Sequence, residues 1–227
     1  MKLLAIDTSS NACSVALQVE NDVIEKHVVE PRAHTKILVP MISQLLADGG
    51  VALSELDAIV LGNGPGSFIG MRIGSSVVQG MCFGAGIPVV PVSSLAVVAI
   101  EVFAEYPFEH VVVAQDAHMN EVYIGRFKKD GNGLPVPQGD ESIVPVGEIP
   151  ATAPPYAAAG AAWELYPELL KANDRNIDTL LPILVPRAKH LLAPGRHALD
   201  KGGAISPDAL IPAYLRNKVA EKSRSFQ

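Results

Sequence analysis

The beginning of the chain consists of apolar runs separated by short polar turns. Residues 2–7, 13–19 and 23–29 form strand-like runs, joined by the turns Thr8–Asn11 and Glu20–Asp22. Apolar runs of this length, bounded by turn residues, are typical of β-strands, and such short turns join antiparallel neighbours. The pattern therefore predicts a three-stranded antiparallel meander.

Helical periodicity then alternates with short apolar strands. The expected elements are a helix at 35–48, a strand at 57–62, a helix at 67–84, a strand at 88–92 and a helix at 94–105. Pro40 fits the first helix only if that helix begins within a turn of it, because proline removes a helical hydrogen bond. A meander extended by parallel strands through right-handed crossovers indicates the ribonuclease-H-like half of the actin and hexokinase architecture.

The second half of the chain begins after a break at Tyr106-Pro107. Strands are expected at 110–116 and 121–127, followed by a proline- and glycine-rich segment at 131–155. We interpret this half as a smaller, degraded copy of the first, on the order of its elements alone. A last helix is expected at about 207–221, packing back on the first lobe.

The predicted fold class is α/β, namely an actin-like, two-lobed fold with mixed sheets and flanking helices. The N-terminal lobe would span residues 1–105 and carry the dimer or partner surface. The smaller C-terminal lobe would span residues 106–227, with the boundary between 103 and 109.

Composition and charge narrow the function classes. The 227 residues, 48% of them hydrophobic, are enough for one large core or two small ones. A formal charge of −6 argues against nucleic-acid binding by this chain alone, because phosphate neutralisation needs clustered lysine and arginine. Cys13 and Cys82 form no CxxC pair, and no apolar stretch is long enough to span a membrane. We therefore expect a cytoplasmic protein without membrane contact.

The first segment with candidate chemistry is the turn Asp7-Thr8-Ser9. In actin-like folds this turn faces nucleotide phosphates, because its amides and hydroxyls donate to anions while the carboxylate holds a hydrated metal. The alternative is an ordinary polar turn whose side chains close their own backbone. The residue types agree with both interpretations.

A glycine-rich segment precedes the second helix. Gly64-Pro65-Gly66 predicts a tight turn, Ser67 can cap the helix, and the free N–H groups at its start suit an anion. The segment lacks the Gly-Lys-Ser/Thr ending of a P-loop, so no lysine is supplied to phosphates. The candidate nucleotide contacts are Asp7, Thr8, Ser9, Gly64, Gly66 and Ser67.

The second helix has a face almost bare of side chains, because Gly66, Gly70 and Gly74 recur every four residues. Each glycine inside a helix costs about 1 kcal/mol relative to alanine, so the row indicates close approach of another element. That element lies within the subunit or on a partner, and the spacing does not distinguish the two. On a partner surface, adaptable contacts would come from Met71, Val78 and Met81.

The sequence shows no pattern typical of a metal site or an activated nucleophile. The six histidines lack HxxxH or HExxH spacing, and no GxSxG motif occurs. Asp116 and Glu121 could form a carboxylate pair, but we interpret them as acids of a hairpin turn. Trp163 is interpreted as a core residue and not as a platform for base stacking. We therefore expect no catalytic residue and no metal ligand.

Motifs along residues 1–218 resemble those of the TsaB family, also called YeaZ. They are Asp7-Thr8-Ser9, Cys13-Ser14-Val15-Ala16-Leu17, Arg32-Ala33-His34, Leu38-Val39-Pro40-Met41-Ile42, the glycine segment 61–74, Pro91-Val92-Ser93-Ser94-Leu95, Asp116-Ala117-His118-Met119-Asn120-Glu121-Val122-Tyr123 and Pro212-Ala213-Tyr214-Leu215-Arg216. Two positions depart from the family pattern. Ile69 replaces a threonine, which removes a hydroxyl beside the turn, and His118 replaces an arginine, which exchanges a permanent charge for a titrating one.

The resemblance implies an ASKHA-type fold and membership of the complex that transfers threonylcarbamoyl to the tRNA adenosine next to the anticodon. Its other members are the catalytic paralogue TsaD, in which an HxxxH pair holds the metal, and the ATPase TsaE. This sequence has no such pair, so we expect a non-catalytic subunit that binds and activates TsaD. tRNA would be bound only through the complex. No cofactor would bind tightly, although ATP or ADP could bind weakly at the partner interface.

Members of this family also form homodimers, through a surface that overlaps the one for TsaD. We expect this surface on the helices at 35–48 and 67–84. The expected contact residues are Ile37, Met41, Gly70, Met71, Gly74, Val78 and Met81. The alternative functions are a stand-alone actin-like ATPase or kinase and a glycoprotease-like enzyme.

Overall fold

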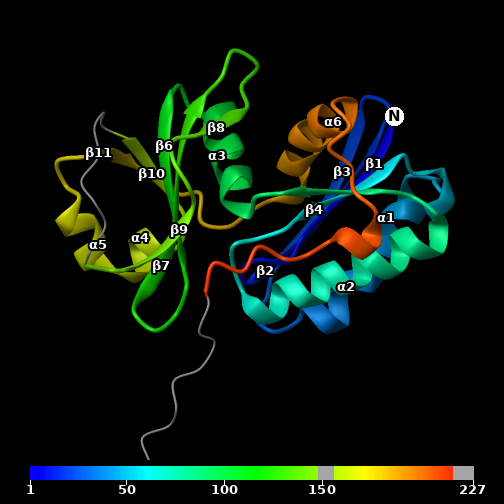
Figure 1. Cartoon of the computed structure of the whole chain (residues 1–227), viewed down its shortest axis with the longest axis horizontal. Helices are drawn as coiled ribbons and strands as arrows, with labels where there is room; N and C mark the ends of the chain where they lie inside the picture. Colours follow the sequence, from blue (N-terminus) through cyan, green and yellow to red (C-terminus); the bar gives the residue numbers. More distant parts are fainter. Residues whose placement is uncertain (148–155, 217–227) are drawn as a thin grey trace, which may run out of the picture.

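The computed structural model describes residues 1–147 and 156–216 and contains two mixed β-sheets, each covered by helices on both faces (Figure 1). The first sheet has the strand order β3-β2-β1-β4-β5. Its strands are β1 Lys2–Asp7, β2 Ala12–Val19, β3 Asp22–Val29, β4 Ala58–Gly62 and β5 Val89–Val92. The first three form the predicted antiparallel meander, and β4 and β5 extend it in parallel.

Helices on both faces of the first sheet explain why β1 is apolar at nearly every position. These elements are α1 His34–Asp48, η1 Leu53–Glu55, α2 Phe68–Ala85, the 3-10 helix η2 Ala188–Leu191 and α6 Leu192–Asp200. Leu4 and Ile6 share a core with α1 and α2. Leu3 and Ala5, which point to the opposite face, share a core with η2 and α6.

The second sheet has the strand order β11-β10-β6-β7-β8, and β9 also pairs with β7. Its strands are β6 His110–Asp116, β7 Glu121–Lys129, β8 Pro135–Pro137, β9 Ser142–Pro145, β10 Tyr156–Ala159 and β11 Ile177–Leu180. One face packs against α3 (Ser94–Glu105). The other packs against α4 (Ala162–Leu165) and α5 (Pro167–Ala172), where Trp163 is the buried core residue that we expected.

Two local predictions are wrong. Pro40 lies well inside α1, which begins at His34, rather than within its first turn. The proline is tolerated on the solvent side, where Lys36, the residue whose carbonyl it leaves without a helical donor, is exposed to water.

The predicted last helix is absent from residues 207–216, and residues 217–221 lie outside the described part. Only the short 3-10 helix η3 (Pro207–Ala209) forms, because the segment is held by contacts that a helix would break. Ile205 pairs with Val89 beside the first sheet. Further on, Ala213 N–H donates to the Asn63 carbonyl at 3.0 Å. The C-terminal segment therefore packs back on the first half in an extended form.

The chain passes between the two halves more than once. α3 precedes the boundary expected near residues 103–109, yet it shares a core with the second sheet. Residues 188–213 follow the second sheet in sequence but pack on the first half. Each half is thus completed by a segment from beyond the point at which we divided the sequence.

Candidate functional site

The Asp7 turn ends β1 and is closed by hydrogen bonds from its own chain. Asp7 Oδ1 accepts from the Ser9 N–H at 2.9 Å and from the Ser9 hydroxyl at 2.8 Å. Asp7 Oδ2 accepts from the Ser94 hydroxyl at 2.9 Å, and the Gly64 N–H donates to Ser94 Oγ at 3.1 Å. The carboxylate therefore connects β1, the glycine segment and the start of α3.

The Asp7 carboxyl is almost completely removed from water, with 1% of the residue exposed. Burial raises the pKa of Asp7 to about 6, against the opposing effect of the hydrogen bonds from Ser9 and Ser94 and the nearby His34. Gly62 is also required here, because a Cβ atom at that position would overlap Asp7 Oδ2. The requirement for glycine at position 62 could not be predicted from the sequence.

The N-terminus of α2 is fixed on the same turn. Ser67 N–H donates to the Ser9 carbonyl at 2.6 Å, and Ser67 Oγ caps the helix by accepting from the Gly70 N–H. Thr8 Oγ1 donates to the Gly70 carbonyl at 2.8 Å. The six candidate nucleotide contacts thus lie close together, and the side chains of Asp7, Thr8, Ser9 and Ser67 already form hydrogen bonds within the chain. Nucleotide contact by these groups stays a prediction.

The row of Gly66, Gly70 and Gly74, which begins just before α2, approaches this turn within the subunit. A Cβ atom would overlap Ser9 at Gly66, the Thr8 carbonyl at Gly70 and the Thr8 hydroxyl at Gly74. The placement of Gly70 and Gly74 on a partner surface is therefore wrong. Their companions Met71 and Val78 are also buried, at 4% and 0% exposure, so neither offers contact area on the surface of the chain.

The remaining interface candidates lie at the seam between α1 and α2. Ile37 and Met81 are half-buried, and Met41 is 9% exposed. These side chains mainly fill the core below the two helices. Ile37, Met41 and Met81 therefore lie at the edge of the surface formed by the two helices and not at its centre.

The outer face of α2 carries a second row of small residues. Ser76, Gly80 and Gly84 are exposed at four-residue spacing, and a Cβ atom at either glycine would meet no atom of residues 1–147 or 156–216 within 4 Å. Two large apolar side chains lie on the same helical face, Ile69 at 70% and Phe83 at 82% exposure. We call these five residues the outer α2 face. The four-residue spacing of Ser76, Gly80 and Gly84 is visible in the sequence, but our prediction considered only the row that begins at Gly66.

Several known proteins are similar in sequence to this chain over nearly its full length. It is 34% identical to the tRNA threonylcarbamoyladenosine biosynthesis protein TsaB of Haemophilus influenzae, covering 98% of this chain and 96% of the relative. The Escherichia coli TsaB is 33% identical, with coverage of 98% and 97%. The chain belongs to the TsaB family. The structure of YeaZ from Pseudomonas aeruginosa superposes with a TM-score of 0.87 at 38% identity, over 94% of this chain and 99% of that one.

A related family model also matches this TsaB-family chain. The model described as TsaD, tRNA N6-adenosine threonylcarbamoyltransferase, matches residues 26–155. Together with the YeaZ neighbour, this match confirms the actin-like ASKHA fold that the element order predicts. No helix among the described residues is long and apolar enough to cross a membrane.

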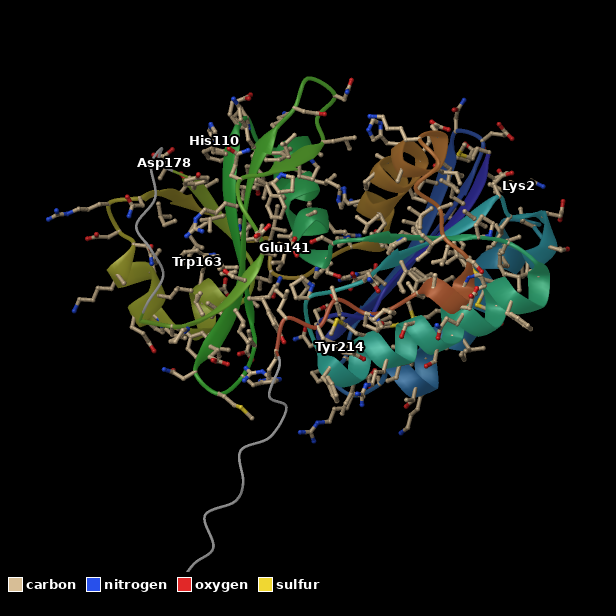
Figure 2. The ribbon with its side chains drawn as sticks, in the orientation of Figure 1. Lys2, His110, Glu141, Trp163, Asp178 and Tyr214 are labelled. Carbon is tan, nitrogen blue, oxygen red and sulfur yellow. The ribbon has the colours of Figure 1, made fainter. Side chains whose placement is uncertain are left out.

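In this TsaB-family chain the C-terminal motif connects the two halves. Figure 2 shows Tyr214 beside the start of α2, where its ring lies 5.6 Å from that of Phe68 and its hydroxyl accepts from Arg72 Nε at 3.2 Å. Two residues later, Arg216 forms an ion pair with Glu121 of the second sheet at 2.5 Å. The motif therefore binds one element from each half.

The acids of the β6–β7 turn are not arranged as a catalytic pair. Asp116 accepts hydrogen bonds from the His118 N–H and from the Tyr166 hydroxyl, both at 2.8 Å. Glu121 is paired with Arg216. Each carboxylate has its own partner, which agrees with their interpretation as hairpin acids.

Proposed function

We propose that this chain takes part in the biosynthesis of tRNA threonylcarbamoyladenosine as a non-catalytic subunit that binds and activates a TsaD-type transferase. The names of its relatives in H. influenzae and E. coli support the pathway. The TsaD family model supports the partnership, because a chain that matches the transferase in fold can pair with it as one pseudo-symmetric half of a dimer. TsaE would join this pair, and the complex would act in the cytoplasm.

The chemistry of the described residues supports a role without catalysis. The Asp7 carboxylate and the hydroxyls of Ser9 and Ser94 are engaged with one another. In the described part of the chain, no hydrogen bond joins a serine of this site to a histidine that could act as its base. The serines thus lack the arrangement that a glycoprotease-like enzyme would require, and the site lacks the lysine expected of a stand-alone kinase.

The outer α2 face is the observation that carries the partner role. Gly80 and Gly84 each cost helix stability, and none of the residues that the structure describes fills the space they leave open. A helix of a partner could enter that space. The exposed side chains of Phe83 and Ile69 would then become buried and contribute apolar area to the interface. The neighbouring outer side of α1 adds Pro40, Ser43 and Ala47, all exposed and uncharged.

The same face would form the homodimer when the TsaD-type partner is absent. A two-fold dimer brings the same surface of both subunits together, so competition between the two assemblies follows directly. tRNA would contact the assembled complex, because a chain with a formal charge of −6 attracts phosphates poorly by itself. Weak ATP or ADP binding would take place at the partner interface near the start of α2.

Reconstitution tests this function. Purified TsaD- and TsaE-type proteins, tRNA and the threonylcarbamoyl donor system are combined with and without this chain, and modified adenosine is measured. We expect modification only when the chain is present, and no ATP hydrolysis by the chain alone. Modification that is independent of the chain would contradict the partner role, and strong ATP turnover by the isolated chain would favour the actin-like enzyme.

A further inference from the structure

Three side chains of types that can bind a metal ion lie close together between α3 and η2, in a cluster that the proposed function does not use. Glu101 and Glu105 are one turn apart on α3, and His190 belongs to η2. One carboxylate oxygen of each glutamate and one ring nitrogen of the histidine all lie within 4.8 Å of one another. The fold thus creates a constellation that the spacing of the histidines in the sequence cannot show.

Two atoms of this cluster are buried without a hydrogen bond. Glu101 is 6% exposed, and its Oε2 atom has no hydrogen-bond partner. The same holds for His190 Nε2, and the 3.7 Å between the two atoms is too long for a hydrogen bond. A buried carboxylate oxygen and a buried imidazole nitrogen cost free energy when nothing satisfies them.

The separation of this pair matches two ligands of one metal ion. Zn²⁺ bonds to histidine nitrogen and carboxylate oxygen are about 2.0–2.2 Å long, so neighbouring ligands of a tetrahedral site lie roughly 3.3–3.6 Å apart. The observed 3.7 Å is close to that value. We propose that Glu101, Glu105 and His190 bind one divalent transition-metal ion of the Zn²⁺ class, with water as a further ligand on the side of the exposed Glu105.

Burial has opposite effects on the two buried side chains of the cluster. Burial lowers the pKa of His190 to about 4, so the imidazole is the neutral form that a metal requires. Burial, and secondarily the charge of Glu105, raises the pKa of Glu101 to about 7.

Charged groups on the neighbouring elements partly oppose and partly support a cation. Arg187 and Lys189 lower the pKa of both Glu101 and His190, which shows that their positive charges act on the cluster. Glu25 on β3 acts in the opposite direction and accepts a hydrogen bond from Arg187 Nη2 at 2.6 Å. The negative charges of Glu101, Glu105 and Glu25 thus offset the positive charges of Arg187 and Lys189.

The position of the cluster gives the metal a structural role. Most buried residues of α3 share a core with the second sheet, whereas η2 shares a core with the first sheet, to which α3 contributes only Val97 among the described residues. An ion held by both elements would therefore cross-link the two halves of the molecule. Metal binding should raise the thermal stability of the whole chain, because the ion binds the folded state alone.

Titration of the metal-free chain with Zn²⁺ by calorimetry, and with Co²⁺ by visible absorption, tests the site. We expect one ion per chain, a rise in Tm, and a Co²⁺ spectrum typical of low coordination number. Glu101→Gln and His190→Gln should each weaken binding by about tenfold or more, since each removes a ligand. Circular dichroism establishes that the variants are folded.

Matched controls come from residues outside the cluster. Glu168→Gln on α5 and His197→Gln on α6 change the same residue types and should leave binding unchanged. Absence of Zn²⁺ and Co²⁺ binding by the folded wild-type chain would overturn the proposal. Binding that is equally strong in all four variants would overturn it as well, because it would mark adventitious binding at the surface.

Discussion

The glycines of α2 have opposite roles according to the side of the helix on which they lie. Gly70 faces the Thr8 carbonyl, with no room for a Cβ atom, whereas Gly80 faces open space. Spacing alone cannot separate these roles, because both sets repeat every four residues. The sequence predicted that close approach must occur, and the structure was needed to show which element approaches.

The first prediction compares Gly70→Ala with Gly80→Ala. Gly70→Ala should destabilise the chain by about 1–3 kcal/mol, because the added methyl group overlaps backbone. Gly80→Ala should stabilise it by about 0.5–1 kcal/mol, because alanine loses less backbone entropy in a helix. Urea unfolding of both variants measures the difference. Equal effects of the two substitutions would show that the helix is oriented differently.

The second prediction concerns the pH dependence contributed by Asp7. Burial raises the pKa of this group from 3.8 to about 6, so the folded chain retains a proton that the unfolded chain has lost between these values. Stability should therefore fall as the pH rises from about 4 to about 6, by on the order of 3 kcal/mol from this group.

Unfolding free energies of the wild type and of Asp7→Asn between pH 4 and pH 7 isolate this contribution. Asparagine does not titrate, so the fall should be smaller in the variant, while contributions of all other groups cancel in the comparison. Parallel pH curves for the two proteins would contradict a raised pKa at Asp7.

At the scale of elements, the meander, the crossovers and α3 could be predicted from the sequence because their apolar periodicity is strong. The short strands β8 and β9 could not, since the proline- and glycine-rich segment that contains them carries no alternation. The helix expected from residue 207 onward failed for a different reason. Its residues are held by tertiary contacts with Asn63 and Arg72, which override local propensity.

The third prediction tests how the C-terminal segment is attached. Tyr214→Ala removes the ring that packs against Phe68 and Arg72, a loss of about 1–2 kcal/mol. Amide exchange should then accelerate at Ile205 and Ala213, whose N–H groups donate to the first half. Tyr214→Phe keeps the ring and should have a smaller effect. Unchanged exchange at both amides in Tyr214→Ala would show that the ring does not hold the segment.

At the scale of the whole molecule, the two-lobed architecture follows from the order of elements, but the exchange of segments between the halves does not. Local patterns carry no information about α3 packing on the second sheet, or about η2 returning to the first. Contacts of this kind are long-range. The cluster of Glu101 and His190 arises at such a contact, which is why histidine spacing gave no sign of it.

The fourth prediction concerns assembly through the outer α2 face. Phe83→Ala removes a ring that is 82% exposed in the monomer, so the stability of the isolated chain should change by less than about 0.5 kcal/mol. Association with the TsaD-type partner should weaken by about 2 kcal/mol, as expected for an aromatic anchor at an interface. Calorimetric unfolding and a binding titration measure the two quantities. Undiminished affinity would place the interface elsewhere.

The most direct test of the proposed partner role measures tRNA modification supported by Gly80→Leu in the reconstituted system. Leucine at this exposed helical position leaves the monomer folded but fills the space that a partner helix would enter. We expect modification to fall by about tenfold or more. Gly131→Leu, at an exposed glycine of the second half with equally open surroundings, should behave as wild type. Full activity of Gly80→Leu would contradict activation of a partner through the outer α2 face.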